Sequence, residues 1–579
     1  MMTYATINGK KAYPAAGTNI KLVIENPFMK LQGNHTHQVT FPLDIPENRS
    51  VFGNVNRIDV SRRVSKYEDC ALFSGNKCLL RGSATVLGFS ENGVKLQFLG
   101  SSSDVKSKMG ELYIDDMEFP EVASPYKTWC QKTNISVPAS VFSQGYGGIR
   151  NQYVFFTVAN ESTGKKYNRL RCYGTPVTCK MKRPVLQPCL IYVLHQVFSI
   201  IGYQVEYDAY DRSPWNDLYI VNVRRSAKIS GALPHWKAST FLEEFRKLFN
   251  AVYLYDEKSK TVRIESYSSI EAFGTMEIEC ESAFSSEYDE EGVAYIGSDN
   301  IAYALETCAE QKTAREIPKE VFNTFEMRSY NTLSEVLTAA GSMTETEKLT
   351  TLFLAGNAGY VYFRKMDGNG TIGYTTCGFF TQLTREENGD EGSTTELKII
   401  PAPMGEIKVN EDEIEDTCLM PCIEGPEWTS ANDEEEVTTL QDVLEEEVSV
   451  EEDSEDGFMP VVFLAGSSTP FIYDNRSDRY YGVMRSLADR RESNLSNDCS
   501  MALVNPGTIT EYIGKFHTGQ ASIDPKNQYL FKFISDSIPD PRKIFIIRNK
   551  RFLCAKVEVS VSDSGIDRLM TGYFYEKTS

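Results

Sequence analysis

The chain has 579 residues, 41% of them hydrophobic and 11% aromatic, which is enough for about three to five domains that each bury a core. Tyr and Phe occur 31 times each, and this usage favours strands over helices. The formal net charge is −20, and the sequence has no evident basic stretch with interleaved aromatic residues, so nucleic-acid binding is not expected.

One segment carries the whole charge imbalance. Residues 409–475 contain 21 acidic residues and no Lys or Arg, which leaves 59 acidic against 60 basic residues in the rest of the chain. The core of this segment, residues 430–457, repels itself and is poor in aromatic residues, so it is predicted to be a flexible spacer. A second interpretation gives this acidic surface a role of its own.

The N-terminus, "MMTYATINGKKAYPAAG", has no apolar core of a signal peptide, and the 13 cysteines are an odd number spread along the chain. We therefore expect a protein made in the cytoplasm with reduced cysteines. The longest apolar run, residues 189–202, is shorter than the roughly 20 residues that cross a membrane. It predicts a buried helix and no membrane anchor.

Residues 37–100 have the pattern of a series of short strands. In "FPLDIPENRSVFGNVNRID" (41–59), we expect Pro42 and Pro46 to fix the start of a strand and "NVNRID" to begin the next one. The runs "RIDVSRRVSKYEDCALFSG", "CLLRGSATVLGFS" and "VKLQFLG" are separated by the turns "SGNK" and "ENG", which predicts hairpins. Strands at this spacing favour a small antiparallel barrel or sandwich.

A helix followed by a strand occurs twice between residues 189 and 266, which predicts an α/β domain. The first helix is expected to end at Gly202 and to bury Leu190, Ile191, Leu194, Val197, Phe198 and Ile201. In the second helix, Thr240 and Glu243 match a capping box and Asn250 is the expected stop. Its apolar face consists of Phe241, Leu242, Phe245, Leu248 and Phe249. The runs "AVYLYD" and "TVRIES" then form a hairpin.

The later part of the chain is again rich in strand patterns. A helix is predicted at "TLSEVLTAA", followed by a meander with turns at "DGNG" and "ENGDEG". "DGNG" also resembles part of a calcium loop, but the Glu ligand that such a loop needs downstream is missing, so a hairpin turn is favoured. The C-terminal run "IFIIRNKRFLCAKVEVSV" predicts a hairpin, and "GYFYEK" is expected to be an edge strand.

These patterns predict a mainly β protein with α+β character, multidomain, built from small antiparallel β-barrels and an α/β domain. The expected divisions are 1–120 for an N-terminal β-barrel, 121–275 for the α/β domain, 276–408 for a second β-rich domain, 409–457 for the acidic flexible segment and 458–579 for a C-terminal β-rich domain.

The search for catalytic and metal-binding residues predicts none. His35 and His37 would share one strand face, but no third ligand stands nearby, and "CLMPC" (Cys418, Cys422) has no second ligand pair. His195 is expected to be a core or partly buried helix residue. Phosphate-binding loops, nucleophile elbows and zinc-protease motifs are absent from the sequence. We therefore expect no catalytic, cofactor or metal site, and no enzyme.

Two features leave sugar chemistry open. With 80 acidic residues, a glycosidase pair of carboxylates cannot be recognised by spacing. The four tryptophans, Trp129, Trp215, Trp236 and Trp428, could stack on sugars, although Trp215 and Trp236 are expected to pack inside the α/β domain.

The pattern of residues 41–59, followed by "ALFSGNKCLLRGSATVLGF", resembles the first barrel of phage tail-hub proteins. The stretches "LPHWKASTFLEEFRKLFNAVYLYDEKSKTVRIES" and "FLCAKVEVSVSDSGIDRLMTGYFYE" are similar to those of hub-type tail proteins from phages and prophages of Bacteroides-like hosts. The resemblance covers most of the chain as dispersed motifs, and the acidic segment does not match the family pattern.

The resemblance implies a structural role at the tail tip of a virion, after synthesis in the bacterial host cytoplasm. It implies a homotrimeric ring that joins the tail tube to the distal baseplate or spike. The implied partners are copies of the chain itself, tail-tube and distal tail proteins, and central spike or fibre proteins, with DNA only as passing cargo. The alternatives are a receptor- or carbohydrate-binding tail protein and a hub-fused cell-wall hydrolase.

Overall fold

The computed structural model of the protein describes the chain from Met2 to Thr578 in ranges separated by gaps. These ranges are 2–29, 33–53, 55, 57, 64–100, 105, 108–110, 112–132, 134–138, 148–149, 151–173, 178–279, 285–288, 300–304, 321, 324–331, 333–355, 359–366, 370–376, 384–386, 394–408, 417–424, 457–464, 471–474, 479–482, 486–487, 489–490, 499–504, 510–517, 522–523 and 527–578. The predicted acidic segment 430–457 therefore lies outside the described residues, apart from Gly457.

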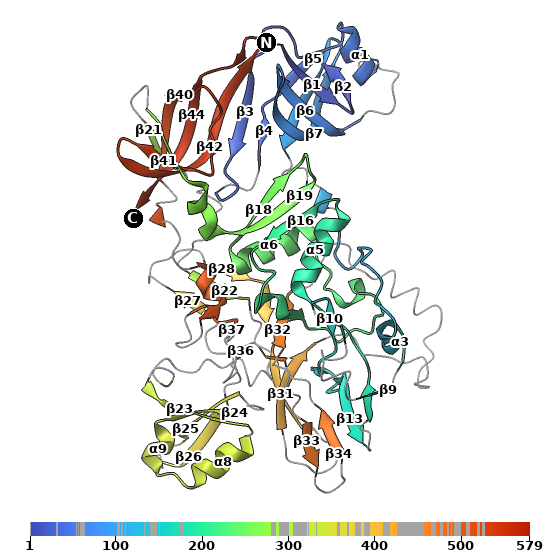
Figure 1. Ribbon diagram of the computed structural model, residues 1–579, viewed down its shortest axis with the longest axis vertical. Coiled ribbons are helices and arrows are strands. Elements are labelled where there is room, and N and C mark those ends of the chain that lie inside the picture. The colour runs from blue at the N-terminus through green and yellow to red at the C-terminus, as the bar shows by residue number, and fades with distance from the viewer. Residues whose placement is uncertain are drawn as a thin grey trace.

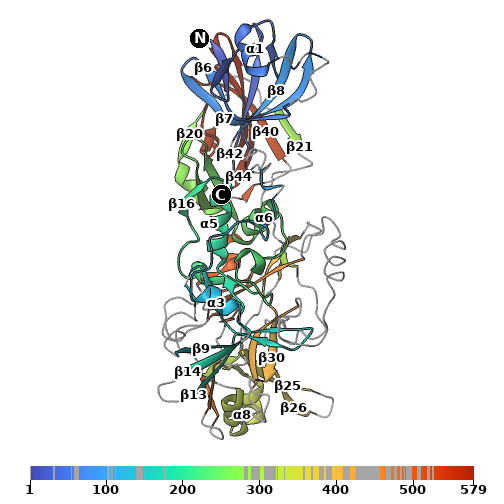
Figure 2. The same ribbon diagram turned by 90° about the vertical axis from the view of Figure 1, so that its right-hand side faces the viewer.

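The molecule is elongated, and its sheets follow one another along the long axis (Figure 1, Figure 2). A large sheet lies at one end, the region of α5 (Leu190–Ile200) and α6 (Ala238–Phe249) lies in the middle, and a small unit with α8 (Leu333–Gly341) and α9 (Glu345–Leu349) lies at the other end. Strands dominate the described residues and form several separate sheets. The predicted class, mainly β with α+β character and multidomain, is confirmed.

The sheet at the first end, here named the terminal sheet, is built from both ends of the chain. Its main path runs β2-β1-β6-β7-β8-β4-β3-β42-β44-β40-β21. Its strands are β1 (Thr3–Ile7), β2 (Lys10–Ala12), β3 (Ile20–Glu25), β4 (His35–Thr36), β5 (Val39–Pro42), β6 (Lys66–Ser74), β7 (Lys77–Ser90), β8 (Gly93–Gly100), β20 (Thr275–Glu277), β21 (Ser285–Tyr288), β39 (Ser522–Ile523), β40 (Asn527–Ile534), β41 (Ile544–Ile547), β42 (Lys550–Ser562), β43 (Gly565–Ile566) and β44 (Leu569–Thr578).

The two halves of the terminal sheet meet where β3 pairs antiparallel with β42. The ladder runs from Ile20 opposite Val561 to Glu25 opposite Lys556. The predicted domain division puts residues 1–120 and 458–579 in different domains, whereas this ladder joins strands from both in one sheet. Polarity patterns predict that a strand exists, but its partner can lie anywhere in the sequence, and here the partner is more than 500 residues away.

The three hairpins predicted in these segments are confirmed. Ser90 pairs with Gly93 at the "ENG" turn between β7 and β8, and Ser74 pairs with Lys77 between β6 and β7. β41 and β42 are joined by Arg548 and Asn549, whose φ values of 51° and 64° are both left-handed. Two left-handed central residues match the tight turn whose twist fits paired antiparallel strands.

The strand start expected at Pro42 and Pro46 is wrong, because Pro42 is the last residue of β5 and Pro46 begins the helix α1 (Pro46–Phe52). A proline at the first helical position loses no hydrogen bond, since that N–H has no partner within the helix. The buried Asn48 amide fixes the helix: its Oδ1 accepts from the Tyr13 N–H at 2.7 Å, and its Nδ2 donates to the carbonyls of Tyr13 and Pro42 at 2.8 Å each. Most of "NVNRID" lies outside the described residues.

The expectation that "GYFYEK" forms an edge strand is also wrong. These residues belong to β44, which pairs with β42 on one side and with β40 on the other. Phe574 and Tyr575 are both fully buried. The last strand in the sequence is thus an interior strand of the sheet, because its position in the chain does not decide its position in the ladder.

The middle of the molecule contains the predicted α/β unit. The three-stranded sheet has the order β16-β19-β18, in which β16 (Gln204–Asp208) runs parallel to β19 (Thr261–Ser266) and β18 (Ala251–Asp256) runs antiparallel to it. Helix α5 precedes β16 and helix α6 precedes β18. The predicted repeat of a helix followed by a strand, and the hairpin after the second helix, are confirmed.

The observed ends of the two helices in this unit agree only in part with the ends predicted from the sequence. Gly202 after α5 has a φ of 89°, and Asn250 after α6 is left-handed with a φ of 48°, as expected of helix stops. The predicted capping box is wrong, because α6 begins at Ala238 with Lys237 as its N-cap, and no side-chain cap bond is present. Thr240 therefore lies inside the first turn, where its side chain does not cap the helix.

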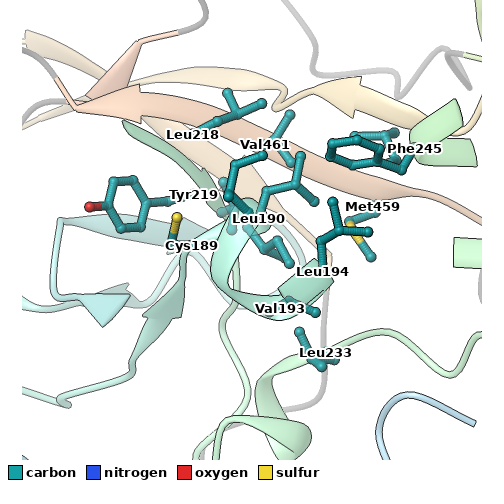
Figure 3. Close-up of a cluster of buried hydrophobic side chains, with 14 of the residues drawn as sticks. Cys189, Leu190, Val193, Leu194, Leu218, Tyr219, Leu233, Phe245, Met459 and Val461 are labelled. Carbon is teal, nitrogen blue, oxygen red and sulfur yellow. The ribbon is translucent and has the colours of Figure 1, made fainter. Parts of the chain in front are cut away.

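The main core joins α5 and α6 to strands from later in the chain (Figure 3). Leu190 and Leu194 of α5 lie among Phe245 of α6, Leu218 of β17 (Leu218–Ile220) and Val461 of β32 (Met459–Leu464). All five side chains are fully buried. Residues before and after the acidic segment therefore share one core.

Further small sheets surround this core. The remaining elements in the main body are α3 (Tyr126–Cys130), β9 (Asn134–Pro138), β10 (Tyr153–Val154), β11 (Val158–Asn160), β12 (Lys166–Tyr167), β13 (Arg169–Tyr173), β14 (Thr178–Lys182), β15 (Gln187–Pro188), β22 (Asn300–Tyr303), β27 (Thr384–Glu386), β28 (Thr395–Leu397), β29 (Ile399–Pro401), β30 (Met404–Lys408), β31 (Thr417–Ile423), β33 (Phe471–Asp474), β34 (Arg479–Gly482), β35 (Ser486–Leu487), β36 (Asp489–Arg490), β37 (Cys499–Ser500) and β38 (Glu511–Tyr512).

The small unit at the far end has a core of its own. Val336 and Ala340 of α8 pack against Phe353 and Val361 in the sheet below. The predicted helix is confirmed, and the strands on the two sides of "DGNG" pair antiparallel up to Lys365 opposite Ile372. Of "DGNG" the structure describes Gly370, and "ENGDEG" lies outside the described residues. The strands of this unit are β23 (Glu326–Tyr330), β24 (Thr351–Ala355), β25 (Gly359–Lys365) and β26 (Ile372–Thr376).

Candidate functional site

A cavity of about 730 Å³ lies where the terminal sheet meets the α/β unit. We name it the junction cavity. β3 contributes Ile24 and Glu25, β18 contributes Val252 and Leu254, and α6 contributes the side with Arg246. The lining mixes apolar and charged side chains from segments that are far apart in the sequence, as is usual for a ligand or partner site between two parts of a protein.

The cations in the junction cavity are held by neighbouring acids. Arg246 donates two hydrogen bonds to Glu243, of 2.7 and 2.9 Å. Arg542 donates to both carboxylate oxygens of Asp540, the shortest bond being 2.7 Å. Bidentate pairs of this kind fix the orientation of both side chains. They stabilise the cavity wall, and their charges are largely neutralised within each pair.

Asp540 shows what this pairing does to a carboxyl group. Burial works to raise the pKa of Asp540, but hydrogen bonds from the side chain and backbone of Arg542, together with its charge, lower it, and the net pKa is below the ordinary value. A carboxyl whose pKa is lower in the folded than in the unfolded state stabilises the fold above its unfolded pKa. That stabilisation is lost as the pH falls through the folded pKa.

Arg542→Ala is therefore expected to raise the pKa of Asp540 and to weaken the acid dependence of stability. The wild type should lose thermal stability faster than the variant as the pH falls from about 6 to about 2, the range in which an Asp carboxyl takes up its proton. The measurement is the melting temperature across that range. Arg551→Ala is the matched control, since Arg551 forms an exposed pair with Glu271. Identical pH profiles for Arg542→Ala and the wild type would contradict the assignment.

An apolar cluster beside the cavity packs the terminal sheet onto the α/β unit. Phe28 follows β3, and its ring lies 5.9 Å from Tyr267 and 5.6 Å from Phe273, measured between ring centroids. Val252 of β18 and Leu553 of β42 belong to the same buried cluster. The junction thus consists of a packed core with a partly polar cavity at its side.

The five histidines do not gather at one place. His35 and His37 lie close, with ring centroids 6.5 Å apart, and His35 Nδ1 is 3.0 Å from the Gly33 carbonyl. His517 is buried, and its Nε2 is 3.0 Å from the Leu248 carbonyl. Among the described residues, groups of three or more His, Cys, Asp or Glu side chains that could hold a metal ion are absent.

Two His–Asp contacts were not predicted from the sequence. His195 Nε2 lies 2.8 Å from the buried Asp208 Oδ2, and the other Asp208 oxygen accepts from the Tyr210 N–H. His235 lies 2.9 Å from Asp115 and stacks on a tyrosine ring. Each pair joins separate segments, and sequence gives no signal for them because the partners are brought together only by folding. The expected partial burial of His195 is confirmed, with 27% of its side chain exposed.

Five buried cysteines, Cys70, Cys130, Cys189, Cys499 and Cys554, are packed thiols without a disulfide. Cys78, which is exposed, and Cys422, which is partly exposed, are also free of disulfides. Burial raises the pKa of Cys130 and of Cys189 to about 12. Such thiols stay protonated at neutral pH and are poor nucleophiles.

The burial of two tryptophans bears on sugar stacking, and the described helices bear on crossing a membrane. Trp215 and Trp236 are fully buried in the main core, as expected, and so cannot stack on a sugar. In the part of the chain that the structure describes, none of the helices is both long and apolar enough to cross a bilayer.

The comparisons with known proteins give structural neighbours only. Neither a family model nor a curated protein matches the chain. Among solved structures, the chain is similar to the 43 kDa tail protein of prophage MuSo2 from Shewanella oneidensis, at 9% identity and a TM-score of 0.30, over 99% of this chain and 97% of that one. It is also similar to the tail protein from Neisseria meningitidis MC58, at 6% identity and a TM-score of 0.27, over 100% of this chain and 96% of that one.

Proposed function

We propose that the chain is a structural protein of a phage tail and that it forms the hub ring joining the tail tube to the distal baseplate or spike. The observation that carries this proposal is the pattern of residues 41–59 and 71–89, which resembles the first barrel of tail-hub proteins. These residues contribute β5, α1, β6 and β7 to the terminal sheet. Closure of such sheets into barrels, and the trimer, are parts of this proposal.

The proposal makes the protein a scaffold without catalytic activity. It is supported by the pairing of charges in the junction cavity and by the raised pKa values of the buried thiols. It is also supported by the elongated series of sheets, because an extended chain of packed units can contact different neighbours at different levels (Figure 2). The proposed neighbours are copies of the chain, the tail tube, distal tail proteins and a central spike or fibre, at the tail tip of the virion.

A ring-forming hub is expected to be a trimer in solution. A closed homo-oligomer buries strand edges that a monomer leaves open. Light scattering on the purified chain should therefore give about three times the chain mass of 65.3 kDa. The control is a dilution series, in which a stable ring keeps its mass while a weak association does not. A monomer at every concentration would contradict the hub proposal.

A further inference from the structure

The sheet of the α/β unit has two edges of different character. Among the described strands, its order β16-β19-β18 puts β16 and β18 at the edges (Figure 1). In β16 the register shifts between Val205 and Tyr207, so that Glu206 is an extra residue. Glu206 is exposed and lies 3.9 Å from Arg263. Bulges and charges prevent an edge strand from pairing with another chain, so the edge of β16 is protected.

The edge strand β18 is regular and apolar. It pairs with β19 without any shift in register, from Ala251 opposite Ser266 to Asp256 opposite Thr261. Val252 is 5% exposed and Leu254 is half-buried, and both belong to the apolar cluster beside the junction cavity. An edge strand with these properties is suited to pair with a further strand.

The ladder on the other side of β19 shows which backbone groups of β18 face outward. The Ile264 carbonyl accepts a hydrogen bond of 2.9 Å from the N–H that follows β16, so the backbone of Ile264 is turned to β16. In a strand, the N–H and C=O of successive residues point to opposite sides. Arg263 is therefore turned to β18, where it is paired with Leu254. It follows that the N–H and C=O of Tyr253 and Tyr255 point away from β19.

These outward backbone groups form a regular row. In the part of the chain that the structure describes, β18 is paired with β19 alone, and the backbone N–H and C=O of Tyr253 and Tyr255 have no hydrogen-bond partner. Positions two apart along a strand are separated by about 6.6 Å. A polypeptide in the extended conformation presents donors and acceptors at the same spacing, so its main chain is the chemical group that matches this edge.

The junction cavity gives such a chain room beside β18. Four consecutive residues, Val252–Tyr255, line the cavity, so it follows the strand along its edge. A second cavity of about 500 Å³ continues the line from Tyr255 to Lys258. On the far side of the junction cavity lie Ile24 of β3 and Leu242 of α6. The open edge therefore borders a space between the terminal sheet and α6.

The lining of this space favours apolar side chains on the added strand. Ile24 and Leu254 are apolar on the side of the terminal sheet, and Leu242 is apolar on the side of α6. The cations Arg246 and Arg542 are each held by a neighbouring acid, so they offer little net charge for recognition. Since successive side chains of a strand point to opposite faces, apolar residues at alternate positions fit best.

We propose that the edge of β18 binds an extended peptide segment of a partner protein, which joins the sheet as a further strand. In this mode of recognition the main-chain hydrogen bonds supply the affinity, and the side chains at alternate positions supply the specificity. The outward groups of Tyr253 and Tyr255 hold the main chain, and the junction cavity takes the apolar side chains. This inference does not depend on the proposed tail function.

The first test uses the full chain and a small panel of fluorescein-labelled peptides of about seven residues, enough to span the edge at ~3.3 Å per residue. The peptides alternate Ser with Val, Leu, Phe or Tyr, and binding is followed by fluorescence anisotropy. At least one peptide is expected to bind. N-methylation of its alternate backbone nitrogens should weaken binding roughly tenfold or more in one phase, because two hydrogen bonds to β18 are lost, and should change it little in the other phase.

The second test changes the edge itself. Tyr255→Pro removes an outward N–H and leaves the hydrogen bonds to β19 in place, since proline is tolerated on the open side of an edge strand. Tyr255→Ala is the matched control, because it loses the same ring and keeps the N–H. The Pro variant should bind the peptide about fivefold more weakly than the Ala variant. If the Pro variant does not fold, as judged by circular dichroism, hydrogen exchange of the wild type replaces it.

In the hydrogen-exchange measurement, the bound peptide should protect residues 251–256 and leave residues 204–208 of the protected β16 edge unchanged. Absence of binding by the whole panel, equal effects of N-methylation in both phases, or equal affinities of the Pro and Ala variants would overturn the proposal. Protection of residues 251–256 that increases with the concentration of the chain alone would assign the edge to a second copy, and would also overturn it.

Discussion

Deletion of residues 1–100 is expected to prevent residues 527–578 from folding into a soluble form. The truncation removes β3 and so exposes the whole edge of β42 from Lys556 to Val561. It also removes Thr3, whose hydroxyl donates to the Ser562 carbonyl at 2.7 Å, and Asn26, whose amide donates to the carbonyls of Pro541 and Cys554. A long open edge beside an apolar face leads to aggregation. The measurement is soluble yield and size-exclusion behaviour.

The control for this truncation removes a part of the chain with its own core. Residues 321–376 form the small unit at the far end of the molecule, and their core is separate from the other clusters. Replacing them by a short Gly/Ser linker should leave the rest soluble. A soluble chain of unchanged melting temperature after loss of residues 1–100 would contradict the β3–β42 pairing. Because of that pairing, an N-terminal truncation cannot by itself test whether the N-terminal region forms a ring.

Local features of the fold follow from the sequence, and distant pairings do not. The "ENG" hairpin and α5 are encoded by neighbouring residues, so polarity and turn residues suffice to predict them. The β3–β42 ladder depends on contacts between the chain ends, which no local pattern encodes. The sequence around Pro46 does not decide between two structures, because proline suits both the start of a strand and the first turn of a helix.

The same contrast between local patterns and distant contacts holds for the surface features of the molecule. The junction cavity is lined by β3 and by the consecutive elements α6 and β18, and the long stretch of sequence between β3 and α6 hides their meeting. The register of basic positions in one small sheet shows the same division. "RLR" at residues 169–171 and "KMK" at residues 180–182 each place two cations two apart, on one face of a strand. Only the register between the strands reveals that the two pairs lie opposite each other.

The largest effect of a single substitution is expected in helix α6. Phe245 is fully buried, and its ring lies 4.7 Å from Phe249 and 5.9 Å from Tyr210 between centroids. Leu248 is also fully buried. Truncation to Ala removes buried apolar surface and leaves a cavity, because a close-packed core relaxes only in part. Phe245→Ala should lower the free energy of unfolding by about 3–5 kcal/mol, and Leu248→Ala by about 2–5 kcal/mol.

The fluorescence of buried tryptophans can report this unit within a multidomain chain, whose global unfolding need not be two-state. The Trp215 ring lies 5.6 Å from Phe249, so unfolding of α6 changes its surroundings. Ser239→Ala, in the first turn of α6 and not fully buried, is the control and should change stability by less than about 0.5 kcal/mol, as usual for positions away from the core. Because α6 shares one buried core with α5 and β32, the two core substitutions should lower the same transition. Negligible effects of both would mean that this helix does not hold the centre of the protein together.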